Sequence, residues 1–484
     1  MRRELRSGHA AVFGGLVLLV WFGAFAKGLY DDWAASVAFA VLTALAIALL
    51  ELARRSRDPL RFPLLAPWLI WLACAWRSTL HSFDVTTSFW EAWTWTFCMV
   101  AFYIAVNMAH RLSVSARRTF LVAMGACAIP LTIMALTQQW TGQPVGYGAM
   151  HLPLLGTLRY GHWEIHATLV NSIVLAGFLL NWAFVAAPAS PSPWRWTIPV
   201  CVGLGILLSR SWTMVGGFLL GGALYLGIQR GRMTASSILK LALPALLVAA
   251  LALAWKTHQQ VEGQYYNASM RLTYWRAAVD MLRFQPATGI GLGAYGVALP
   301  FFKQAAGENT RLAHGVLWQI GAETGIPGLL TFLGLILAIG VTAWRSARHE
   351  EPETRALGVT LGILLLCGLT TIHFDYFLNR LVAVLFAGIL CAQAPTRVVL
   401  KATPFANLIA IPCLITISAL WLSLFRAEQF YAAGDYRGAL RLNPRLADSW
   451  YALSKRYPEP LAAQLRQTAW HWKKDPRFLR PNGG

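Results

Sequence analysis

Apolar runs long enough to cross a lipid bilayer recur along the first 425 residues, and they constrain the fold more than any other feature. An α-helix needs about 20 apolar residues to span the hydrocarbon core. Inside lipid, every backbone N–H and C=O group must be paired within the protein, and a helix pairs them itself. Charged residues make up only 13% of the chain, about half their share in a soluble domain. The sequence therefore predicts an all-α, polytopic membrane helix bundle.

Thirteen runs are predicted as membrane spans, which agrees with a bundle of about 12–13 transmembrane helices. They cover residues 10–30, 33–51, 62–76, 89–108, 120–140, 165–187, 196–208, 212–228, 238–255, 316–344, 356–372, 377–391 and 404–425. Between the ninth and tenth spans lies a large polar loop, residues 256–313. We expect residues 1–425, loop included, to form one transmembrane domain, followed by a small helical tail at 426–484.

Basic residues gather in alternate connections between the spans, for example at Arg54, Arg55 and Arg57. The positive-inside rule then predicts a multi-pass protein of the bacterial inner membrane with a cytoplasmic N-terminus. An odd number of spans places the loop and the tail in the periplasm. The net charge of +20 reflects this topology, so membrane lipids are expected as partners and nucleic acid is not. All seven cysteines lie in apolar runs, and no metal-binding spacing is visible.

Charged side chains kept near the outer face of a membrane are expensive and are candidates for function. Arginine offers a planar donor fork that suits a diphosphate, although interfacial snorkelling or ion pairing is the alternative. The charged candidates at this face are Arg159, Arg210, Arg271, Arg276, Asp375 and Arg380.

Residues 271–282 of the loop predict an amphipathic helix that lies against the outer surface. Trp275, Val279 and Leu282 share one of its faces. Arg271 and Trp275 are four residues apart, so they are neighbours on this helix. They are suited to stacking on a sugar or a lipid head group, or simply to anchoring the helix.

A glycine-rich turn and a histidine complete the loop. Gly291 to Gly296 satisfies the dinucleotide pattern G-x-G-x-x-G, but it follows a predicted helix where the motif requires a strand. We instead expect a tight turn with a close backbone approach. His314 is expected in the first turn of the next span, where an imidazole could exchange a proton with a hydroxyl or merely mark the interface. Glu323, roughly opposite it on a straight helix, is expected to serve structure.

Five short motifs follow one another between residues 155 and 392. They are Ser209-Arg210, Arg271-x-x-x-Trp275, Pro286-x-x-Gly289-x-Gly291-x-Gly293, Ala313-His314 and Ala322-Glu323-x-Gly325-x-x-Gly328. In this order the set resembles the superfamily of O-antigen ligases, O-antigen polymerases and protein O-oligosaccharyltransferases, which implies a GT-C-like helix bundle. The family usually has Asn directly after the histidine. Gly315 stands there in this chain, so another group must orient the histidine.

The resemblance implies a membrane glycosyltransferase that takes a glycan from undecaprenyl diphosphate without metal or cofactor. The acceptor hydroxyl would belong to lipid A core, to another glycan or to a protein. His314 would act as the catalytic residue, while Arg210 and Arg271 would bind the donor diphosphate together with Arg159, whose surroundings match only loosely. Possible supporting residues are Trp275, Arg276, Asp375 and Arg380. A transporter is the alternative from another class, but the chain shows no inverted repeat.

The tail contains one helix-turn-helix segment, residues 432–453, that resembles a single tetratricopeptide repeat. One repeat cannot bury its own apolar face. The tail is therefore predicted to pack on the loop, on a partner, or on a second, degenerate repeat that runs through Trp470.

Overall fold

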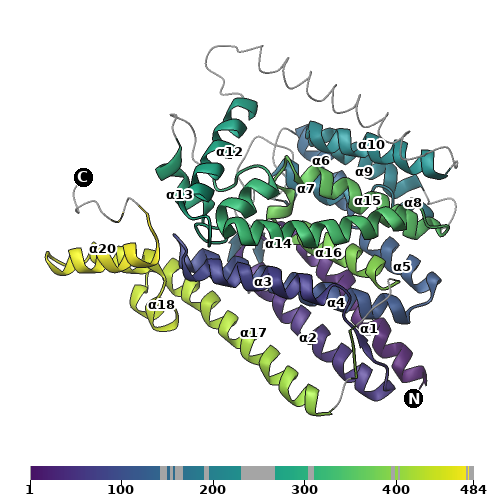
Figure 1. Ribbon diagram of the computed structural model, residues 1–484, viewed down its shortest axis with the longest axis horizontal. Coiled ribbons are helices and arrows are strands. Elements are labelled where there is room, and N and C mark those ends of the chain that lie inside the picture. Colours follow the sequence, from purple (N-terminus) through teal and green to yellow (C-terminus); the bar gives the residue numbers. More distant parts are fainter. Residues whose placement is uncertain are drawn as a thin grey trace. The chain divides into compact units, whose positions relative to one another are not determined.

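The computed structural model describes residues 2–141, 150–152, 156–158, 167–169, 171–189, 196–229, 267–303, 310–393, 398–401, 404–475 and 478 (Figure 1). Helices dominate this part of the chain, which confirms the predicted all-α class. Strands occur there only as two short antiparallel pairs: β1 (Leu60–Arg61) with β4 (Val399–Leu400), and β2 (Met150–Leu152) with β3 (Gly156–Leu158). The predicted span at 238–255, Arg159 and the first residues of the loop lie outside the described residues.

The described chain divides into two compact units, and four long helices each contribute residues to both. The first unit comprises Met1–Leu65, Cys98–Gln259 and Ile336–Ala410. The second comprises Ala66–Phe97, Gln260–Leu335 and Ile411–Gly484. The helices at the boundaries are α3 (Leu65–Leu80), α4 (Val85–Arg111), α14 (Val316–Ala347) and α17 (Pro404–Ala432).

The first unit is a bundle of mostly apolar helices. Its further elements are α1 (Arg2–Phe25), η1 (Lys27–Leu29), α2 (Asp32–Ser56), α5 (Val114–Gly125), α6 (Ala128–Thr141), α7 (Ser172–Leu180), α8 (Ala186–Ala189), α9 (Thr197–Leu208), α10 (Trp212–Gln229), α15 (Pro352–Gly368), η3 (His373–Asp375) and α16 (Phe377–Cys391). Within it α1 packs on α2, α6 on α9, and α10 on α15. Small residues allow close crossings: a Cβ at Gly217 of α10 would lie 2.6 Å from Sγ of Cys367 on α15.

The second unit holds the polar loop and the tail. Its further helices are α12 (Asn267–Phe284) and α13 (Tyr295–Phe302) in the loop, and α18 (Tyr436–Leu442), α19 (Ala447–Ser454) and α20 (Leu461–Trp472) in the tail. Asp435 caps α18, accepting a 2.9 Å hydrogen bond from the backbone N–H of Gly438. The helix-turn-helix predicted in the tail is present as α18 and α19, and α20 packs against α19.

Six stretches of described helix are long and apolar enough to cross a membrane by length and composition. They are Gly8–Phe25, Trp33–Ser56, Val85–Arg111, Val114–Thr141, Trp212–Gln229 and Val316–Ala347. Each coincides with a predicted span. The other predicted spans within the described residues also fall on helices, several of them shorter, and their insertion stays a prediction.

The last of these helices, α14, is interrupted where the sequence predicts a continuous span. Gly325 adopts φ 73° and ψ −174°, which no helical residue does, and Pro327 follows two residues later. Proline has no N–H, and the N–H of Ile326 donates to the carbonyl of Pro286 instead of to its own helix. The carbonyls of Ala322 and Glu323 are thereby left without helical partners and become available to the loop.

Candidate functional site

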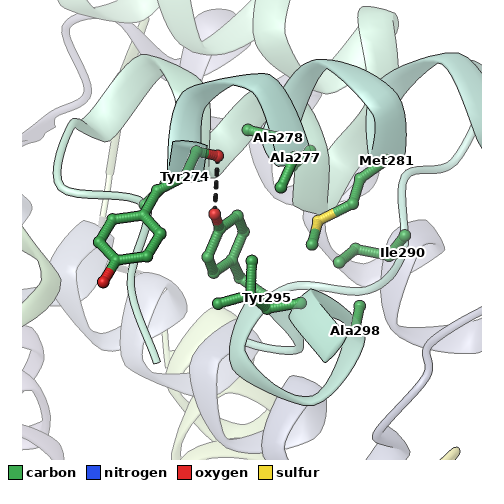
Figure 2. Close-up of a cluster of buried hydrophobic side chains, with 10 residues drawn as sticks. Tyr274, Ala277, Ala278, Met281, Ile290, Tyr295 and Ala298 are labelled. Atoms are coloured by element: carbon green, nitrogen blue, oxygen red, sulfur yellow. Dashed lines mark hydrogen bonds between the residues drawn. The ribbon is translucent and has the colours of Figure 1, made fainter. Parts of the chain in front are cut away.

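The loop helix α12 packs through a face one position away from the predicted one. Its most buried residues are Tyr274, Ala277, Ala278 and Met281, which meet Ile290, Tyr295 and Ala298 in one apolar cluster (Figure 2). The predicted face of Trp275, Val279 and Leu282 is only half-buried. The helix was predicted correctly, but the neighbouring α13 selects the face that packs.

Two tyrosines fix α12 on α13. The hydroxyl of Tyr295 donates a 2.8 Å hydrogen bond to the backbone carbonyl of Tyr274 (Figure 2). Tyr295 is fully buried and Tyr274 nearly so. A buried tyrosine hydroxyl needs such a partner, so the bond holds the second turn of α12 in one position.

The glycine-rich turn fills the break in α14. The backbone N–H groups of Ile290 and Gly291 donate 3.0 Å hydrogen bonds to the carbonyls of Ala322 and Glu323, which lose their helical partners at the break. Gly291 has φ 107°, and a Cβ there would lie 2.0 Å from Oγ of Ser82. The expected tight turn and close backbone approach are therefore both present, and only glycine fits.

Glu323 and Gln319 connect α14 to the residues just before His314. The Glu323 carboxylate accepts a short hydrogen bond from the amide of Gln319 and a 3.3 Å bond from the backbone N–H of Tyr295. The amide oxygen of Gln319 in turn accepts a 2.6 Å bond from the N–H of Ala313. Glu323 thus serves structure, as the sequence predicts, and the chain of bonds fixes the backbone that carries the histidine.

His314 lies outside the helix that it was expected to begin. α14 starts at Val316, and His314 has a left-handed backbone with φ 57°. Its ring stacks on Tyr274, with centroids 5.7 Å apart and planes 21° apart. Nδ1 is buried and has no hydrogen-bond partner among the described residues. Burial, and next the charge of Arg271, lower the pKa of His314 to about 4. The imidazole is therefore neutral at neutral pH.

Arg271 and Trp275 are one helical turn apart on α12, as predicted. Arg271 is close enough for its charge to act on His314, and burial lowers its own pKa. The indole of Trp275 stacks on Trp318 of α14, with centroids 5.6 Å apart and planes 20° apart. Arg276 is exposed on another face of α12. The structure therefore gathers Arg271, Trp275 and His314 in one unit.

Sequence reasoning missed Tyr274 and Trp318, which stack on His314 and Trp275. The available signals were weak: Tyr274 directly precedes Trp275, and Trp318 comes four residues after His314. Aromatic residues at helix ends are common in membrane proteins, so their type alone does not mark them.

The other charged candidates belong to the first unit. Arg210, in the turn between α9 and α10, has φ 54° and an exposed side chain between the buried Ser209 and Ser211. Arg380, in the first turn of α16, is buried, and its Nη2 donates a 3.2 Å hydrogen bond to the carbonyl of Asp375. Arg380 and Asp375 therefore lie together. Among the described residues, no group of His, Cys, Asp or Glu side chains is arranged to hold a metal ion.

A comparison with protein families matches the region that carries Arg210, Arg271 and His314. Residues 198–333 match the family model described as O-antigen ligase. The match spans α9, α10, α12, α13 and the first part of α14, and it includes Arg210, Arg271 and His314. No curated protein matches the chain. The match supports glycan transfer of the O-antigen ligase or polymerase type, performed by a multi-pass membrane protein on lipid-linked substrates. Residues 198–333 are therefore similar to the O-antigen ligase family, and the resemblance expected from the motifs is confirmed over this region.

Proposed function

We propose that the protein transfers a glycan from undecaprenyl diphosphate to a hydroxyl of lipid A core at the periplasmic face of the inner membrane. The observation that carries this proposal is the neutral, half-buried imidazole of His314 beside the guanidinium of Arg271, inside the matched family region. A base and a permanent cation are the two groups that such a transfer requires.

The reaction is an in-line displacement at the anomeric carbon of the glycan. The acceptor oxygen forms the new bond to this carbon while the bond from the carbon to the diphosphate breaks. His314 takes the proton of the acceptor hydroxyl. Arg271, which lies in the same compact unit as His314, stabilises the charge that grows on the departing diphosphate. The family resemblance assigns the same role to Arg210 and, more loosely, to Arg159. A base with a pKa near 4 is weak, so its contribution depends on close positioning of the acceptor.

The location of the tail agrees with a periplasmic site. The backbone N–H of Lys474 donates a 2.6 Å hydrogen bond to the carbonyl of Phe83, between α3 and α4. The ring of Trp470 contacts Phe301 of the loop, with centroids 6.3 Å apart. The tail packs on the loop, one of the three predicted arrangements. Because the tail and the loop contact one another within one unit, they lie on the same side of the membrane, which we propose is the periplasm. Residues 1–425 then form the transferase domain.

The glycans of a deletion strain test the acceptor. A ligase predicts lipid A core without long O-chains, while polymerised glycan accumulates on undecaprenyl diphosphate. Single repeat units on the core would instead indicate a polymerase. Normal lipopolysaccharide together with an unglycosylated surface protein would indicate protein glycosylation. Unchanged glycans of all three kinds would contradict the proposal and favour a transporter or another activity.

A further inference from the structure

The proposed reaction uses His314 and Arg271 but leaves unexplained the pair of stacked indoles beside them. Tyr274 and Trp275 are consecutive residues of α12. Tyr274 stacks on His314, just before α14, and Trp275 stacks on Trp318, in the first turn of α14. The interplanar angles of 21° and 20° are nearly equal. The same helix contact that positions the histidine therefore also positions the indole pair.

The outer member of the pair is accessible and the inner member is held. Trp318 is 39% exposed, whereas Trp275 is half-buried and its Nε1 is buried without a partner among the described residues. Because Trp275 lies flat against it, the Trp318 ring cannot turn freely. A rigid aromatic face of this kind loses little entropy when it binds a ligand.

The chemistry around this face favours a sugar over a lipid tail. The C–H face of a pyranose packs on the π-face of an indole, since the ring face is negative and the C–H groups are positive. Tyr274, the neighbour of Trp275 on α12, stacks on His314, so the stacked indoles lie beside the residue at which the proposed reaction transfers the glycan.

We propose that Trp318, supported by Trp275, is a sugar-binding platform for the glycan that is transferred next to His314. This inference rests on the proposed function, because it names the part of the substrate that the same site holds. The platform binds a pyranose ring of the glycan, and its loss weakens substrate binding more than it slows the chemical step.

A binding experiment separates this inference from the proposed reaction. The probe is the soluble oligosaccharide released from the cell's own undecaprenyl-linked glycan, added to the purified full-length protein. Trp318→Ala should weaken the Kd about tenfold, and Trp318→Phe, which keeps a smaller ring, about threefold. Trp344→Ala is the matched control, since Trp344 lies at the other end of α14 and is 40% exposed. Its Kd should equal that of the wild type.

His314→Gln distinguishes failure of the platform from failure of the reaction. This variant should bind the oligosaccharide with the wild-type Kd although it transfers nothing. In transfer assays, Trp318→Ala should raise KM with little change in kcat. A wild-type Kd and KM in both Trp318 variants would overturn the platform, even if transfer by the wild type is confirmed. An effect of Trp318→Ala on membrane insertion alone would identify an interfacial anchor and would also overturn it.

Discussion

The imidazole of His314 lies flat on the ring of Tyr274, with centroids 5.7 Å apart. The guanidinium of Arg271 is near enough for its positive charge to lower the pKa of this imidazole. Burial and this cation both oppose protonation of the histidine. The local environment therefore keeps a neutral base at the junction of the loop and α14.

Transfer should resist acid because the pKa of His314 is lowered from 6.5 to about 4. The neutral form is the active base, so kcat/KM should stay level as the pH falls through 6.5 and decline only as it approaches about 4. The free energy of unfolding should change in the same direction. The contribution from this histidine is complete above about pH 6.5 and is lost as the pH falls toward 4, because the unfolded chain takes up the proton first. Rates of transfer measured from pH 4 to 8 test this, and an acid limb near 6.5 would contradict it.

Gln319→Leu should reduce both stability and transfer. The variant leaves the buried N–H of Ala313 without its acceptor and removes a donor from the Glu323 carboxylate. Such losses cost about 1–3 kcal/mol each. Thermal unfolding should show the lower stability, and Gln319→Glu should not restore it, since a second carboxylate would face Glu323. Stability equal to the wild type in Gln319→Leu would show that the bonds are dispensable.

Gly291→Ala should destabilise the loop by about 1–3 kcal/mol, because φ 107° disfavours any side chain and Ser82 occupies the space. Gly334→Ala in α14 is the control: apart from its chain neighbours and the adjacent backbone of its own helix, no atom of the described residues lies within 4 Å of the added Cβ. Thermal unfolding of the two variants measures the difference. Equal midpoints would contradict the close approach.

Lys473 should hold the tail against Asp84, which directly precedes α4. Its Nζ lies 2.9 Å from Asp448 and 3.7 Å from Asp84. Burial alone would lower the pKa of Lys473, but the two carboxylates outweigh it and the pKa is raised. A double-mutant cycle of Lys473→Met and Asp84→Asn should give a coupling on the order of 1–2 kcal/mol in unfolding. Limited proteolysis should cut the tail sooner in Lys473→Met, and additive effects would contradict the coupling.

Much of the fold follows from the sequence, because lipid imposes a simple requirement on backbone hydrogen bonds. The apolar runs predict helices, and the spans predicted at 10–30 and 33–51 fall on α1 and α2. Residues 271–282 form a helix as expected within α12. These elements are defined by patterns local to one segment, which a single sequence displays.

The features that depend on how segments meet were not predictable. The break at Gly325 depends on the turn whose N–H groups donate to the carbonyls that lose their helical partners in α14, so both segments must be known. The stacking of Trp275 on Trp318 depends on the register between two helices. The charged candidates were found because a charge near lipid is costly. The sequence does not show that Arg271 belongs to the same compact unit as His314, whereas Arg210 belongs to the other unit.

The central claim is tested most directly by transfer with purified components. Wild-type protein, His314→Ala and Arg210→Ala are each incubated with undecaprenyl-diphosphate-linked glycan and lipid A core, with Arg283→Ala as the exposed-arginine control on α12. The wild type and Arg283→Ala should ligate glycan to the core at the same rate. His314→Ala and Arg210→Ala should each be slower by about 100-fold or more while remaining folded. Transfer at the wild-type rate by both variants would contradict the account.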